Sequence, residues 1–440
     1  MALWDHGADD RANSAGSRSS AAKPAQVDAP IPAFLRRNVS LPRYGNDNSH
    51  FPFEDGPALE LDCLRRVLAP QLLRAAELRR RELGIGADQV LIHWGVIDEA
   101  AYLRRLSFHT GVGIANFSGV DRGDSPLTDS QLPFAATFGI IPLRQDGRLT
   151  WTLAPRRYAA RTLCRLSEEY PSVIPNMRLS ASSSLQQFMT QQGNRALAHG
   201  ATHGLSEKFP KMSAAPVTER GALWWHRLRR GCGVAALAVM PPVLIGATWS
   251  DVLAVWFLLF IGLRLTGSLW RRESLPNLAR LSDARLPVYT IIAALYREAS
   301  SVAPLIQAIN ALDYPPEKLD VILVIEPDDL QTRAAIARLG TMPHVQILIA
   351  PDVAPKTKPK ALNYALPFAR GSFVAVFDAE DRPEPNQLRA ALDAFRIHGD
   401  DVACAQAALC IDNTTNSWLS RGIMAQTPQD NFEAALTLAA

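Results

Sequence analysis

The alternation of apolar and polar residues divides the chain into segments of different character. Residues 1–50 are rich in Ser, Ala, Asn, Asp and Pro and show no hydrophobic period. This composition predicts a disordered tail, because it cannot bury enough apolar surface to offset the loss of chain entropy. Helical spacing begins near Ala58 and predicts a small α+β domain over residues 58–178. The polar stretch 180–216 is expected to be a linker, and a second domain is expected over residues 280–440.

The first domain shows helix and hairpin patterns. Residues 87–117 carry apolar side chains at helical spacing on both sides of Gly95, which predicts two short helices meeting there. Asp98 is the expected N-cap of the second helix. Residues 132–157 predict a helix followed by a β-hairpin that turns at Gln145–Asp146–Gly147.

An apolar block separates the two domains. Residues 231–270 contain only Asp251 and Arg264 as charged residues. Because roughly 20 apolar residues cross a bilayer core, the block predicts two transmembrane helices. The Trp and Arg residues of 224–230 and 270–272 favour a multi-pass protein of the inner (plasma) membrane, in contact with lipid, with both soluble parts in the cytoplasm. The alternative is a buried helical hairpin of a soluble protein.

Length, charge and cysteine content restrict the class of protein. A chain of 440 residues predicts two or three domains, and a net charge of +3 does not indicate nucleic acid as a partner. The five cysteines have no paired or metal-like spacing, which agrees with a reducing compartment. The polar start of the chain lacks the apolar core of a secretory signal.

Four apolar runs in the second domain predict buried strands. They cover residues 287–295, 319–326, 345–350 and 372–377, and each is followed by a helix-like or loop segment. Such alternation predicts βαβ units and a mainly parallel sheet, so this domain is expected to have an α/β fold.

Acidic residues follow three of these four runs. Ligands of open α/β sheets bind beyond the carboxyl ends of the strands, and carboxylates gathered there repel unless a cation binds. Hard oxygen ligands suit Mg²⁺ or Mn²⁺, and such an ion favours a substrate that carries a diphosphate. The alternative is a set of solvated loops. The acids are Glu298 after the first run, Glu326, Asp328 and Asp329 after the second, and Asp378, Glu380 and Asp381 after the fourth.

Basic residues support the diphosphate hypothesis. Lys356, Lys358 and Lys360 precede a predicted helix that contains Asn363. Lysines before a helix N-terminus can neutralise phosphate together with the helix dipole.

Four sequence stretches of the second domain together resemble a known family. The stretches VYTIIAALYREAS, LDVILVIEPDD, KPKALNYAL and FDAEDRPEPNQL lie between residues 287 and 413 and resemble the family 2 glycosyltransferases, particularly the membrane-anchored branch related to cellulose and hyaluronan synthases. The resemblance implies a GT-A-like fold and a nucleotide-diphospho-sugar donor, commonly a UDP-sugar, used in polysaccharide or glycan synthesis.

The resemblance also implies roles for the acidic and basic residues. The nucleobase and ribose would lie near Glu298, Glu326, Asp328 and Asp329. The donor phosphates would lie near Lys360 and Asn363. The Mg²⁺ or Mn²⁺ would be held by Asp378 with Glu380 or Asp381, and would act as a Lewis acid on the departing diphosphate.

The resemblance does not extend to the acceptor half of the family's catalytic domain. The Thr-Glu-Asp motif that carries the family's general base does not occur in the sequence, and neither does the family's Gln-x-x-Arg-Trp motif. No catalytic base is assigned, so an incomplete domain with impaired transfer is expected. The alternative is a non-catalytic membrane protein that binds a partner or a nucleotide.

A second resemblance concerns the first domain. The stretches VLIHWGVIDEAAYLRRLS and FGIIPLRQDGRLTWTLAPRR resemble the N-terminal domain of type II secretion ATPases. Some relatives of that domain bind cyclic di-GMP through an Arg-Leu-Gly opening, but this chain has Ala87–Asp88–Gln89 instead. The resemblance therefore favours a module that binds a protein partner. The sequence has no Gly-rich phosphate loop ending in Lys-Ser/Thr, which argues against an ATPase.

Overall fold

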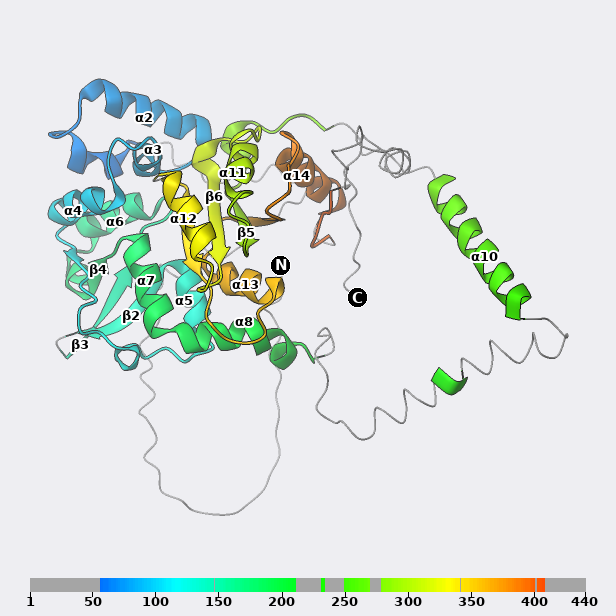
Figure 1. Cartoon of the computed structure of the whole chain (residues 1–440). Helices are drawn as coiled ribbons and strands as arrows, with labels where there is room; N and C mark the ends of the chain where they lie inside the picture. Colours follow the sequence, from blue (N-terminus) through cyan, green and yellow to red (C-terminus); the bar gives the residue numbers. More distant parts are fainter. Residues whose placement is uncertain are drawn as a thin grey trace, which may run out of the picture.

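The computed structural model describes most of the chain outside its two ends (Figure 1). We call residues 56–210 the N-terminal module and residues 278–407 the C-terminal domain. The predicted tail of residues 1–50 and the last 33 residues of the chain lie outside the described residues. The described ranges are 56–145, 147–210, 231–233, 249–269, 278–340, 342–399 and 402–407.

The N-terminal module begins with helices. Gly95 has a φ of +68°, and the chain turns there between α3 and α4. Asp98 caps α4, because its Oδ1 accepts a hydrogen bond of 2.7 Å from the Ala101 N–H. The two-helix prediction is therefore confirmed. The helices are η1 (Leu59–Leu64), α2 (Pro70–Leu83), α3 (Ala87–His93), α4 (Glu99–Thr110), η2 (Arg122–Asp124), α5 (Leu132–Phe138), α6 (Ala159–Glu169) and η3 (Pro171–Asn176).

A small mixed sheet completes this part of the module. Strand β2 pairs antiparallel with β3 from Ile140↔Leu153 to Gln145↔Arg148, so the predicted hairpin is confirmed. Parallel pairing joins β3 to β4 and β4 to β1, in the order β1-β4-β3-β2. The strands are β1 (Gly113–Ile114), β2 (Ile140–Gln145), β3 (Arg148–Leu153) and β4 (Met177–Leu179).

The predicted linker over residues 180–216 is wrong for most of its length. Residues of this stretch form helices α7 (Ser182–Gln192) and α8 (Asn194–Lys208). Leu185, Phe188 and Leu197 are buried in a hydrophobic core that also contains residues of the C-terminal domain. The segment is helical because tertiary packing buries its few apolar side chains, which are too sparse to give a clear helical period in the sequence.

The C-terminal domain has the predicted parallel sheet. All its strand pairs are parallel, in the order β7-β6-β5-β8. The α/β fold expected from the four apolar runs is therefore confirmed, with strand ends within two residues of the predicted ones. The elements are η5 (Asp283–Arg285), β5 (Tyr289–Leu295), α11 (Val302–Asn310), η6 (Pro316–Lys318), β6 (Leu319–Ile325), α12 (Leu330–Arg338), β7 (Val345–Ile349), α13 (Lys358–Ala365), η7 (Leu366–Phe368), β8 (Phe373–Phe377) and α14 (Gln387–His398).

Both faces of this sheet are buried, which explains the continuous apolar runs. Successive side chains of a strand point to opposite faces. Ile291 of β5 lies in one core with side chains of α11 and α14. Its neighbour Ile292 lies in the other core, with side chains of α13, α5, α7 and α8. The N-terminal module thus helps to cover one face of the sheet.

Polar contacts fix the module against the C-terminal domain at other points. Arg79 of α2 donates two hydrogen bonds, of 3.0 and 3.2 Å, to the carboxylate of Glu317 in η6. The indole N–H of Trp94 donates to the same carboxylate at 3.3 Å. At Gly84, a Cβ atom would lie 2.9 Å from the backbone oxygen of Ala284, so the close approach of α2 and η5 requires glycine there.

The apolar block between the two parts contains helix α10 (Trp249–Leu269). Its large apolar side chains from Leu253 to Leu265 are exposed. Among the described residues, no helix meets the length and apolarity that a membrane crossing requires. The predicted transmembrane hairpin is therefore not supported, and residues 234–248, where its first helix was expected, lie outside the described part.

Candidate functional site

The carboxyl ends of β5, β6 and β8 lie at the same edge of the sheet because these strands are parallel and adjacent. The polar segments that follow them are Tyr296–Glu298, Glu326–Asp329 and Asp378–Asp381. We call this region the acidic edge. Several polar contacts join the segments to one another and to helix α13.

A buried ion pair joins the end of β6 to α13. Lys360 Nζ lies 3.0 Å from Glu326 Oε1, and the Lys360 side chain is 2% exposed. The ammonium group also donates to the backbone oxygens of Pro351 at 3.1 Å and Val353 at 3.2 Å. A lysine has three N–H donors, so these acceptors satisfy the group completely. In this conformation Lys360 anchors α13 to the sheet edge.

A second ion pair extends from the same helix end to β8. Lys358 Nζ pairs with Asp378 Oδ1, and both side chains are about half exposed. The backbone N–H of Asp378 donates to Asp381 Oδ2 at 2.7 Å, which fixes the Asp381 carboxylate against the start of the loop after β8. Burial raises the pKa of Asp381 although Lys358 acts to lower it. Glu380, between the two, is exposed.

Asp329 has a structural role. Its Oδ1 accepts the N–H of Thr332 at 3.1 Å and caps α12, while its Oδ2 accepts the N–H of Arg297 at 2.5 Å. Burial acts to raise the pKa of Asp329, but these hydrogen bonds outweigh it and hold the pKa below its usual value. Arg297 has a φ of +60°, an uncommon backbone conformation for a residue other than glycine, and the hydrogen bond to Asp329 supports it.

Asp328, in contrast, points to solvent. Its Oδ2 accepts a hydrogen bond of 3.2 Å from the Tyr296 hydroxyl, which comes from the end of β5. Lys356 Nζ lies 3.8 Å from Asp328 Oδ1 and 2.9 Å from Asp352 Oδ1. The hydrogen bond to Asp352 is the main reason why the pKa of Lys356 is raised. Exposed carboxylates and lysines thus alternate along the acidic edge.

Two of the residues predicted near the donor, Glu298 and Asn363, make contacts outside the group of exposed carboxylates and lysines. Glu298 donates its N–H to Thr332 Oγ1 at 3.1 Å, and its Oε2 is buried with no hydrogen-bond partner among the described residues. Asn363 points away from the acidic edge, because its amide nitrogen donates to the Ala201 oxygen of α8 at 3.1 Å.

The structure separates the three lysines named from the sequence and adds one acid. Lys358 and Lys356 reach exposed carboxylates, whereas Lys360 is committed to Glu326. Asp352 follows β7 just as the other acids follow their strands, so the same rule would have found it. Within the described parts of the chain, no group of three or more His, Cys, Asp and Glu side chains is arranged to hold a metal ion.

Comparison with known proteins identifies the class of this domain. Residues 285–440 match the sequence model of a family described as "Glycosyltransferase like family 2". The C-terminal part of the chain thus matches a family 2 glycosyltransferase domain, which confirms that part of the predicted resemblance. The comparisons did not confirm the predicted resemblance of the N-terminal module to secretion ATPases.

Two curated relatives are similar in sequence to part of the chain. A beta-monoglucosyldiacylglycerol synthase of Trichormus variabilis is 23% identical over 206 residues, which are 46% of this chain and 43% of the relative. A protein of the same name from a Nostoc species shows the same identity and coverage. The chain therefore spans less than half of the length of the curated relatives that it matches.

Solved structures show partial likeness. A mannosyltransferase of Pyrobaculum calidifontis, in complex with GDP-Man and Mn²⁺, is 21% identical with a TM-score of 0.27, over 41% of this chain and 46% of that protein. S. aureus TarS in complex with UDP-GlcNAc is 19% identical with a TM-score of 0.22, over 25% of this chain and 31% of that protein.

Proposed function

We propose that the acidic edge binds a nucleotide-diphospho-sugar together with Mg²⁺ or Mn²⁺, in a GT-A-type domain that transfers the sugar to an acceptor. One observation carries the proposal. The first turn of α13 brings Lys358 and Lys360 to carboxylates at the ends of two different strands, Asp378 after β8 and Glu326 after β6. Cationic and anionic groups from separate loops thus meet where α/β sheets bind ligands.

The donor set suits a hard cation that retains other oxygen ligands. Mg²⁺ is commonly held by one or two carboxylates, with phosphate oxygens and water completing its shell. Asp378 and Asp381 are the residues that would hold the ion, since both lie in the loop after β8 and the Asp381 carboxylate accepts the backbone N–H of Asp378. When bound, the ion would supply Lewis acidity that stabilises the leaving diphosphate.

The other residues would bind the donor. Lys358 and Lys356 are exposed and near the carboxylates, so they are the cations available to phosphate oxygens. Asp328 and Tyr296, from adjacent strand ends, present polar atoms to a ribose or base. Lys360 and Glu326 would act indirectly by fixing α13.

A lipid-associated protein is part of the proposal. The curated relatives are named for making a glucosyl-diacylglycerol, which makes a lipid acceptor a reasonable class to test. Consecutive side chains of α10 from Val255 to Ile261 are large, apolar and exposed, and such a surface favours contact with an apolar phase. We propose that α10 contacts the inner (plasma) membrane, with the donor site in the cytoplasm.

The rate of transfer remains a prediction. Loss of a general base lowers a rate by about 10²–10⁴-fold. No described residue is assigned as the base, so we expect donor binding to be easier to detect than transfer.

Binding tests the proposal most directly. Titration of the full chain with UDP-glucose, UDP-GlcNAc and GDP-mannose, each with and without Mn²⁺, should show Mn²⁺-dependent binding of at least one donor. Asp378→Ala and Asp381→Ala should abolish it. Glu384→Ala is the matched control, since Glu384 is an exposed acid of the same loop. No binding of any donor at millimolar concentration would reject the proposal and favour a non-catalytic module.

A further inference from the structure

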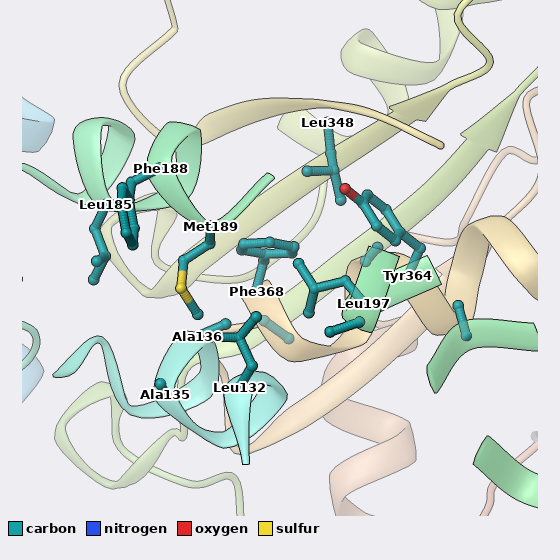
Figure 2. Packing of buried hydrophobic residues seen from close by; sticks show 14 of the residues in the cluster. Leu132, Ala135, Ala136, Leu185, Phe188, Met189, Leu197, Leu348, Tyr364 and Phe368 are labelled. Atoms are coloured by element: carbon teal, nitrogen blue, oxygen red, sulfur yellow. The ribbon is translucent and has the colours of Figure 1, made fainter. Parts of the chain in front are cut away.

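Helix α13 lies between the sheet of the C-terminal domain and helix α8 of the N-terminal module. Ala361, Tyr364 and Ala365 of α13 share a hydrophobic core with Ile292 and Ile322 of the sheet. The same core contains side chains of the module, and Figure 2 labels seven of them together with Tyr364 and Phe368. These module residues are Leu132, Ala135, Ala136, Leu185, Phe188, Met189 and Leu197.

Direct polar contacts accompany this packing. Asn363 Nδ2 donates to the Ala201 oxygen at 3.1 Å. The hydroxyl of Tyr364 lies 3.5 Å from Asn194 Oδ1. Burial of Tyr364 raises its pKa to about 12, so the hydroxyl keeps its proton and acts as a donor. Both acceptors belong to α8, so two successive residues of α13 face the module.

A helix that covers a sheet in an α/β fold usually has its outer side in solvent. In this chain α8 also contacts α13, through the bonds of Asn363 and Tyr364 to Ala201 and Asn194. Helix α13 is therefore held on two sides. Protein cores are close-packed, so a displacement of α8 or a cavity beneath it is transmitted to α13.

The end of α13 that projects beyond this packed region carries the lysines of the acidic edge. Lys358 reaches Asp378, and Lys360 reaches Glu326. The position of α13 therefore sets how far these ammonium groups lie from the carboxylates.

We infer that α8 is a positioning element for the donor site, and that Leu197 and Asn194 are positioning residues that act on it through α13. The inference rests on the proposed function, since it assigns the N-terminal module a role in donor binding by the other domain. It does not require the module to bind any ligand of its own.

The experiment compares binding of UDP with Mn²⁺ by the full chain and its α8 variants, using calorimetry. Leu197→Ala should weaken UDP binding about tenfold, because small displacements of binding groups have large effects. Leu197→Met, which conserves volume, should bind nearly as the wild type does. Asn194→Ala should weaken binding less. His203→Ala is the matched control on the exposed side of α8 and should have no effect.

Hydrogen exchange of α13 provides the second measurement. Residues 358–365 should exchange faster in Leu197→Ala than in Leu197→Met. If Leu197→Ala does not fold, Asn194→Ala still decides the question. Folded Leu197→Ala and Asn194→Ala variants that bind UDP as tightly as the wild type would overturn the inference alone. A wild-type chain that shows no Mn²⁺-dependent binding of UDP would overturn the proposed function, and the inference with it.

Discussion

Lys360 Nζ lies 3.0 Å from Glu326 Oε1, and both side chains are almost completely removed from solvent. Two backbone oxygens complete the shell of the ammonium group. A buried ion pair is strongly interdependent, because each charge without its partner is left uncompensated in a medium of low dielectric constant. The pair connects the helix that carries Lys358 to the central strand β6.

Replacing Lys360 by Met should lower the free energy of unfolding by about 3–5 kcal/mol, since Glu326 would stay buried without a partner. Urea denaturation of the full chain measures the effect. The double variant Lys360→Met/Glu326→Leu should recover much of the loss, because no buried charge then remains. Equal stability of the single variant and the wild type would show that Glu326 is solvated.

Adjacent acids at the end of β6 should respond differently to replacement. Asp329→Ala removes the cap of α12 and the acceptor of the Arg297 N–H, and should cost about 0.5–2 kcal/mol of stability. Asp328→Ala should leave stability nearly unchanged, because Asp328 is exposed, but should weaken binding of nucleoside diphosphates. Thermal unfolding and calorimetric binding on the same two variants separate the roles. If Asp328→Ala lowered stability while Asp329→Ala only weakened binding, the roles assigned to the two carboxylates would be wrong.

The strands of the C-terminal domain could be predicted because β5 and β6 are buried on both faces and therefore show as uninterrupted apolar runs. Parallel topology then places the acids after those runs at one edge without further information. Contacts made by side chains over long sequence separations could not be predicted. Nothing in the sequence indicates that Lys360 pairs with a glutamate 34 residues away while Lys358 pairs with Asp378.

The same limit explains the error at helix α8. Its sequence, NRALAHGATHGLSEK, has few large apolar residues, so it resembles a polar linker. Alanine favours helix, but the signal is weak without a packing partner. That partner is α13, which follows α8 by some 150 residues in the sequence. The contact of Asn363 with α8 could not be predicted for the same reason, because its hydrogen bond to Ala201 connects two parts of the chain that were expected to be separate.

A buried carboxyl in the N-terminal module should make stability depend on pH. Burial, and next the negative charge of Glu60, raise the pKa of Asp88 from 3.8 to about 7. Between these values the folded chain holds a proton that the unfolded chain has released, so stability falls as pH rises through this window. Above about pH 7 the loss is complete.

Asp88→Asn should remove this dependence while retaining an acceptor for the amide of Gln89, which donates to Asp88 at 2.8 Å. In urea denaturation from pH 4 to pH 8, the free energy of unfolding of the variant should rise relative to that of the wild type as pH rises. Asp129→Asn, which changes an exposed carboxylate, is the control and should leave the profile in place. Parallel profiles for Asp88→Asn and the wild type would contradict the assignment.

Lys358 occupies one oxygen of Asp378, the carboxylate that we propose as a metal ligand. Mn²⁺ would have to displace this ammonium group, and a bound diphosphate would offer the lysine a new partner. Lys358→Gln should therefore tighten binding of Mn²⁺ alone and weaken binding of UDP in the presence of Mn²⁺, each by about two- to fivefold.

Lys356→Gln is the matched control, since Lys356 pairs with Asp328 and Asp352 and not with Asp378. It should leave the affinity for Mn²⁺ unchanged. Electron paramagnetic resonance of free Mn²⁺ and calorimetry of UDP measure the two affinities separately. If Lys358→Gln changed both affinities in the same direction, Lys358 would not compete with the metal, and the ion pair would only support the loop.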